Sequence, residues 1–147
     1  MTIEGYIEWA IRDTFLTYLD AVHASIELSS GAERSERGTV DFPVSHRSAD
    51  RIEASGSFRA TAHGGALDLE ITEPVILRQA SHWVLGWTGS DGCQPRARLL
   101  GITPAALPED YTFEDVALTS DGASQFGGNY RPWSRMAPIR LTPLPRG

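Results

Sequence analysis

The amino-acid sequence predicts a mainly β fold, an antiparallel β-sandwich or flattened barrel with one N-terminal α-helix. Apolar residues recur at helical spacing only near the N-terminus. Beyond that point, at least five segments alternate apolar and polar residues and are separated by short turns, which is typical of antiparallel strands. The 147 residues suffice for one substantial core, so we expect residues 1–147 to form a single domain.

The predicted helix covers Thr2–Val22. Its apolar stripe contains Ile7, Ile11 and Tyr18 and ends at Val22, and these positions share one face of a helix. Because much of this segment is apolar, we expect the helix to pack across one opening of the sheet.

The predicted strands follow the helix in chain order. The charged, Ser-rich segment Gly31–Gly38 predicts a loop, and Pro74 predicts a sheet edge or a bend. Regular alternation predicts strands over Ala24–Leu28, Thr39–Val44, Arg51–Ala62, Ala66–Ile71 and His82–Trp87, and less regular patterns predict strands over Arg96–Ile102, Tyr111–Leu118 and Ile139–Leu141.

Charge and composition exclude several classes of function. The net charge of -6 is atypical of proteins that bind nucleic acid or anionic membranes. The absence of lysine excludes a lysine Schiff base, and the single cysteine, Cys93, excludes an intrachain disulfide. No secretory signal and no membrane-spanning apolar run is visible, so we expect a cytoplasmic protein, or one from the cell surface if the sequence is a trimmed piece.

No catalytic motif identifies an enzyme. The sequence contains no HExxH, GxSxG, CxxC or phosphate-binding glycine motif. The four histidines are scattered, and no pair of them has the spacing of zinc ligands. We therefore expect a binding protein with no catalytic residues.

Three segments carry polar or aromatic residues that are candidates for a ligand site. Thr14 and Tyr18 are four residues apart on one helix face, His63 lies at a hairpin turn, and Tyr130 follows two glycines. Each residue alone has an ordinary interpretation, as a core tyrosine with its hydroxyl at the surface, an exposed turn residue or the aromatic anchor of a loop.

Four blocks and a closing strand, taken together, resemble one protein family. The blocks are W-A-I-R-D-T-F-L-T-Y over Trp9–Tyr18, G-S-F-R-A-T-A-H-G-G-A-L-D-L over Gly56–Leu69, I-T-E-P-V-I over Ile71–Ile76 and L-T-S-D-G-A-S-Q-F-G-G-N-Y over Leu118–Tyr130, and the closing strand is Pro138–Leu141. In this order they resemble the HtaA domain family, a haem-binding module of actinobacterial haem-uptake proteins.

The resemblance implies a bound ferric haem b with Tyr18 as the axial iron ligand. It further implies that His63 hydrogen-bonds the Tyr18 phenolate and that Thr14 replaces a serine that contacts a propionate. Tyr130 stands at the family's aromatic pair near the haem, in which Asn129 replaces a phenylalanine. Phenolate is a hard anionic ligand that suits ferric iron, which agrees with this assignment.

The expected pocket lies between the helix face with Thr14 and Tyr18, the His63 turn and the Gly127–Tyr130 loop. We expect the polar tips of Tyr18 and His63 to lie within reach of a hydrogen bond. Haem is the first candidate ligand, for a carrier, buffer or sensor. Another apolar small ligand on the same fold is the alternative, and a haem-dependent or haem-degrading enzyme ranks last. A homodimer stays an open alternative.

Overall fold

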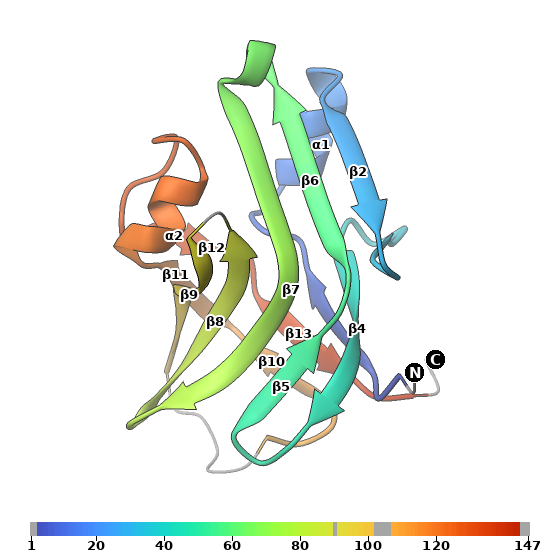
Figure 1. Ribbon diagram of the computed structural model, residues 1–147, viewed down its shortest axis with the longest axis vertical. Helices are drawn as coiled ribbons and strands as arrows, with labels where there is room; N and C mark the ends of the chain where they lie inside the picture. The colour runs from blue at the N-terminus through green and yellow to red at the C-terminus, as the bar shows by residue number, and fades with distance from the viewer. Residues whose placement is uncertain (1–2, 90, 102–106, 145–147) are drawn as a thin grey trace.

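The computed structural model describes residues 3–89, 91–101 and 107–144 (Figure 1). Its elements, in chain order, are β1 (Tyr6–Trp9), α1 (Phe15–Ala21), β2 (Ser25–Ser29), β3 (Glu33–Arg34), β4 (Val40–Arg47), β5 (Arg51–Ala54), β6 (Ser57–Ala62), the 3-10 turn η1 (His63–Gly65), β7 (Leu67–Gln79), β8 (His82–Gly89), β9 (Gly92–Leu100), β10 (Tyr111–Phe113), β11 (Asp115–Leu118), α2 (Ser120–Gln125), β12 (Arg135–Met136) and β13 (Ile139–Thr142).

The strands form one strongly curled antiparallel sheet, a half-barrel with one main helix. Its strand order is β10-β13-β1-β4-β5-β7-β8-β9-β11-β12, and β6 and β2 extend the sheet from β7. The long strand β7 runs the length of the molecule, and α1, η1 and α2 all lie in the same half of it (Figure 1). The predicted mainly β fold with an N-terminal helix is confirmed.

The predicted extent of that helix is wrong. Residues Tyr6–Trp9 form β1, which pairs with β4 on one side and β13 on the other, and α1 begins only at Phe15. Two non-glycine residues in left-handed conformations, Ile11 (φ 69°) and Thr14 (φ 63°), separate the strand from the helix. The first predicted residue, Thr2, lies outside the described residues.

Several strand predictions need smaller corrections. The predicted loop 31–38 contains the short strand β3, which pairs with β4. The predicted strand 51–62 is two strands that both pair with β7, because the strand is interrupted at Gly56 (φ 102°), where a Cβ would lie 2.9 Å from the Cβ of Ala32. The predicted segment 111–118 is also two strands, β10 and β11, which pair with β13 and β9. The predicted strand end at Ile102 lies outside the described residues.

Pro74 marks a bend, as predicted, but the strand continues through it. The register of β7 against β8 shifts between Thr72 and Val75, and Glu73 adopts a positive φ of 50°. The Glu73 N–H donates to the Gly56 carbonyl at 2.9 Å, next to the last β6–β7 pair, Ser57 and Thr72. This bulge curves β7 and helps the sheet to curl.

Large aromatic side chains fill the interior of the sheet. Trp9, Trp83 and Trp87 are fully buried, and the indole Nε1 of Trp9 donates to the carbonyl oxygen of Ala137 at 2.9 Å.

The short helix α2 was not predicted. Its N-terminus is capped by Thr119, whose Oγ1 accepts a hydrogen bond from the Gly122 N–H at 3.1 Å. None of the helices in the described ranges combines the length and hydropathy that crossing a bilayer requires.

Candidate functional site

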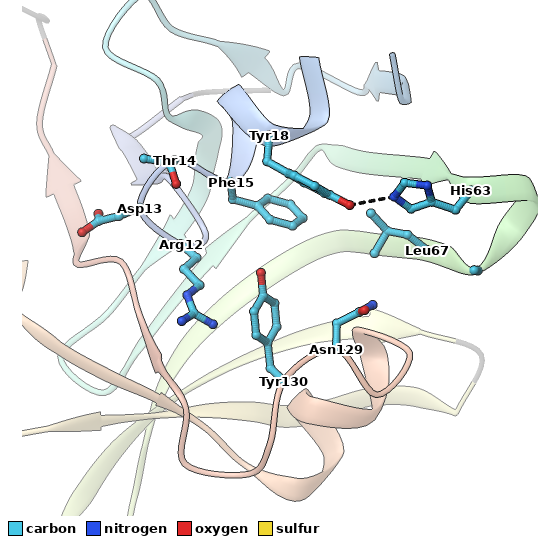
Figure 2. Close-up of a pocket in the computed structure, with 10 residues that line it drawn as sticks. Arg12, Asp13, Thr14, Phe15, Tyr18, His63, Leu67, Asn129 and Tyr130 are labelled. Atoms are coloured by element: carbon cyan, nitrogen blue, oxygen red, sulfur yellow. Dashed lines mark hydrogen bonds between the residues drawn. The ribbon is translucent and has the colours of Figure 1, made fainter. Parts of the chain in front are cut away.

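A pocket of about 410 Å³ opens beside α1, and its volume lies within the roughly 300–1,000 Å³ of known small-molecule sites. Three parts of the chain that are distant in sequence build it: the α1 segment, the η1 turn with the start of β7, and the loop after α2 (Figure 2). The lining residues are Arg12, Asp13, Thr14, Phe15, Tyr18, His63, Ala66, Leu67, Asn129 and Tyr130.

All five predicted site residues line this one pocket. They are Thr14, Tyr18, His63, Asn129 and Tyr130. The predicted location, between the helix face, the hairpin turn and the glycine loop, is therefore confirmed as a place in the structure. Five further residues line the pocket, and no role was predicted for them, although all lie inside the motif blocks: Arg12, Asp13, Phe15, Ala66 and Leu67.

The central polar contact joins Tyr18 to His63. The Tyr18 hydroxyl lies 2.6 Å from His63 Nε2, which is a short hydrogen bond and confirms the predicted proximity (Figure 2). Because a neutral imidazole accepts at one nitrogen, the phenol donates to Nε2 when the His63 proton is on Nδ1. Tyr18 is 44% exposed, so the phenol oxygen is accessible from the pocket.

The helix α1 holds Tyr18 in this position through its opposite face. Phe15, Leu16 and Leu19 are buried in the core, while Tyr18 points away from it. Asp20, on the same helix, accepts hydrogen bonds from Arg34 at both of its carboxylate oxygens, at 2.9 and 2.6 Å. This ion pair lowers the pKa of Asp20. The short strand that carries Arg34 therefore fastens the exposed side of the helix.

The turn η1 holds His63 by backbone geometry. His63 itself adopts a positive φ of 56°, and Gly64 and Gly65 follow with φ of 64° and 96°. No atom lies within 4 Å of where a Cβ would stand on either glycine, so their conformation, and not close packing, calls for glycine. The turn thereby directs the imidazole back toward α1.

Aromatic rings in edge-to-face contact line the pocket and pack beneath it. Phe126 is fully buried and makes edge-to-face contacts with Phe15, at 6.2 Å between ring centroids, and with Tyr130, at 5.1 Å. Leu67 is also buried and adds an aliphatic wall. A flat apolar ligand would find aromatic and aliphatic surface on the side of the pocket that faces the core.

Asn129 has a local hydrogen-bond partner. Its Nδ2 donates to the Phe126 carbonyl at 2.6 Å, beside the backbone bond from the Asn129 N–H to the same carbonyl at 3.2 Å. The side chain thus closes the turn after α2. This leaves its Oδ1 as the polar atom that Asn129 can offer to a ligand.

The polar groups of the pocket suit a ligand whose metal is already coordinated by an organic group. In the part of the chain that the structure describes, no group of three or more His, Cys, Asp and Glu side chains could hold a bare metal ion. The pocket instead offers one accessible phenol with an imidazole partner, surrounded by apolar walls. Such a set supplies a single hard oxygen donor to a metal held by an organic ligand.

Known proteins resemble the chain over most of its length. A family model described as Htaa matches residues 4–142. The fold is similar to the C-terminal domain of HtaA from Corynebacterium glutamicum (19% identity, TM-score 0.74, 95% of this chain and 96% of that chain covered) and to the N-terminal domain of HtaA from the same organism (21%, 0.73, 97% and 98%). It is also similar to the haem-binding protein HtaB of C. glutamicum (18%, 0.65, 95% and 92%). No curated protein matches the chain.

Proposed function

The chain belongs to the HtaA family, and from this premise we propose that it binds haem in the pocket beside α1. One structurally similar protein is named as haem-binding, and the pocket combines a phenol donor with aromatic and aliphatic walls. The observation that carries the proposal is the 2.6 Å hydrogen bond between Tyr18 and His63 inside this pocket.

In this proposal, Tyr18 is the axial ligand of ferric haem b. Tyrosine is an established axial ligand of haem iron, and a phenolate favours the ferric over the ferrous state because it is anionic and hard. Phe15 and Leu67 provide apolar surface beside this oxygen. Haem contributes the iron and the flat macrocycle, and the protein contributes the fifth ligand and the walls.

In this proposal, His63 is the hydrogen-bond partner of Tyr18 both before and after the hydroxyl loses its proton. A free phenol ionises with a pKa of about 10, so ligation near neutral pH displaces a proton from the Tyr18 hydroxyl. In the free protein this hydroxyl and Nε2 of His63 are already hydrogen-bonded at 2.6 Å. When Tyr18 is a phenolate, its oxygen can only accept, so the proton resides on Nε2 and His63 becomes the donor.

The exposure of the ligand favours a protein that exchanges its haem. Tyr18 is 44% exposed and His63 is also exposed, so a donor or acceptor protein could approach the iron ligand without unfolding the core. The hydrogen bond from His63 also reduces the electron density that the phenolate donates to iron. We therefore propose a carrier, buffer or sensor of haem.

A hemin titration tests the proposal. We expect saturable one-to-one binding with the visible spectrum of a five-coordinate tyrosinate complex, and loss of that spectrum in Tyr18→Phe. Tyr111→Phe removes a hydroxyl that does not line the pocket and should leave the spectrum unchanged. An unchanged spectrum in Tyr18→Phe would refute Tyr18 as the ligand. The absence of saturable hemin binding to the unaltered chain would refute haem and favour another apolar ligand, whereas turnover with peroxide or a reductant would favour an enzyme.

A further inference from the structure

The guanidinium of Arg12 lines the pocket and has no carboxylate partner among the described residues. Its guanidinium carbon lies 4.5 Å from the centroid of the Tyr130 ring. Within residues 3–89, 91–101 and 107–144, no carboxylate lies within ion-pair distance of Arg12. Figure 2 shows the Arg12 side chain extending toward Tyr130, while the neighbouring Asp13 carboxylate points the other way.

This lack of a partner distinguishes Arg12 from most arginines of the described chain. Those that are paired with Asp or Glu are Arg34, Arg37, Arg51, Arg59, Arg96, Arg135 and Arg140. In a protein with a net charge of -6, acidic partners are abundant. An unpaired guanidinium at a pocket wall is therefore available to an anionic group that comes with the ligand.

The backbone around Arg12 holds it in place. Ile11 is fully buried with a positive φ of 69°, and its carbonyl accepts a hydrogen bond from the Ala137 N–H at 3.0 Å. The Arg12 N–H donates to the Ala10 carbonyl at 2.7 Å, and the Arg12 carbonyl accepts from the Phe15 N–H at 2.9 Å. The tight turn between β1 and α1 thus fixes the point from which the side chain enters the pocket.

Stacking on Tyr130 leaves the N–H groups of the guanidinium free to bind an anion. A guanidinium that packs against an aromatic ring uses its face, while its donors point outward in the plane of the group. These donors form a fork that matches the two oxygens of a carboxylate. Phe15 lies between the Arg12 side chain and the Tyr18–His63 pair, and Leu67 lies beside His63 (Figure 2).

We infer that Arg12 recognises a carboxylate of the ligand and so selects planar, apolar ligands that carry a free carboxylate at one edge. The inference rests on the proposed function, in which this carboxylate is one haem propionate. Arg12 then determines which edge of the macrocycle faces the turn between β1 and α1. It is a specificity-determining residue and does not contact the iron.

The test compares hemin with its dimethyl ester, in which both carboxylates are blocked, on the unaltered chain and on Arg12→Gln. Because Arg12 is exposed, its ion pair with the carboxylate is partly screened by water, and we expect Arg12→Gln to weaken hemin binding about two- to fivefold. The ester should bind both proteins with equal affinity, and the hemin affinity of the unaltered chain should fall more steeply with salt than that of Arg12→Gln. Arg131→Gln removes a charge that does not line the pocket and is the matched control.

The outcomes separate this inference from the proposed function. Equal hemin affinity in Arg12→Gln and the unaltered chain, or an equal loss for hemin and its ester, would overturn the role of Arg12 while Tyr18 ligation stands. In both proteins the tyrosinate spectrum should persist, because the iron ligand is unchanged. If the unaltered chain lacks saturable hemin binding, the proposed function itself fails. Matching melting temperatures for the variant and the unaltered chain show that the loss does not come from unfolding.

Discussion

Replacing His63 with alanine should weaken haem binding about tenfold and leave the fold intact. In the free protein, the hydrogen bond from the Tyr18 hydroxyl to His63 joins two exposed, neutral groups, so it contributes about 0.5 kcal/mol. In the complex, the same contact becomes a charge-assisted hydrogen bond to a phenolate, worth about 1.5–2 kcal/mol at a partly exposed site. The difference of about 1–1.5 kcal/mol corresponds to roughly 5- to 13-fold weaker binding.

This magnitude lies near the lower end of the roughly 10- to 100-fold loss found when partners of metal ligands are removed. Alanine has a Cβ as histidine does, so the positive φ of 56° adds only a small strain in the variant. The free energy of unfolding should therefore change by no more than about 0.5 kcal/mol, which urea denaturation measures.

Hemin affinity is measured by absorbance titration of His63→Ala, with His46→Ala as the control because His46 is exposed and does not line the pocket. We expect the control to match the unaltered chain. The His63→Ala complex should keep a tyrosinate spectrum, because Tyr18 remains. Equal affinity of His63→Ala and the unaltered chain would refute the proposed role of the imidazole, and a spectrum of different ligation would show that His63 itself binds the iron.

Three further substitutions test the framework of the site. Asp91→Asn should lower the melting temperature more than Asp68→Asn, because the arginine partner of Asp91, Arg96, is fully buried, whereas the partner of Asp68 is half-exposed. Since Arg96 lowers the pKa of Asp91, this contribution is present above about pH 3.9, the ordinary carboxyl value, and is lost as the pH falls below it; a melting series between pH 3 and 7 measures it. Phe126→Ala should cost about 3–5 kcal/mol of unfolding free energy in urea and also weaken hemin binding, because the ring is fully buried beneath the pocket. Gly122→Ala should cost about 3 kcal/mol, because its Cβ would stand 1.8 Å from the Arg96 carbonyl oxygen; unchanged urea stability would contradict this.

The strands were predictable where one face of the sheet is buried and the other is exposed. In the first half of β7, the buried residues Leu67, Leu69 and Ile71 alternate with the exposed residues Asp68 and Glu70. This is the pattern that a half-buried strand leaves in a sequence. The bend at Pro74 was also predictable, since proline cannot donate to the ladder.

The strand β1 was not predictable from the same signal. It lies between β4 and β13, and Ile7, Glu8 and Trp9 are all buried, so no alternation marks it. Burial of Glu8 is accommodated by Arg37 and Thr142, which approach its carboxylate from distant parts of the chain. Because the turn that follows contains neither glycine nor proline, the apolar spacing of a strand and a short helix together imitated one long helix.

The candidate site was predictable only as a set of residues. Tyr18 and His63 are 45 residues apart, and nothing local to either residue marks the other as its partner. The resemblance of the ordered motif blocks to one family predicted that these two residues meet. Arg12 was not predicted as a site residue, because its position depends on the left-handed turn at Ile11 and Thr14, for which the sequence carries no signal.

The structure separates the residues that hold the fold from most of those that line the pocket. On α1, Phe15 and Leu19 enter the core, while Tyr18 points away from it, so a substitution of Tyr18 opens no cavity in the core. His63 likewise projects from a turn whose conformation is set by its backbone. Phe126 is the exception, because its ring is buried in the core and also contacts Phe15 and Tyr130, which line the pocket. Substitutions at the exposed pocket positions can therefore change ligand specificity while the fold is kept. Substitutions of the buried Phe126 should change stability and ligand binding together.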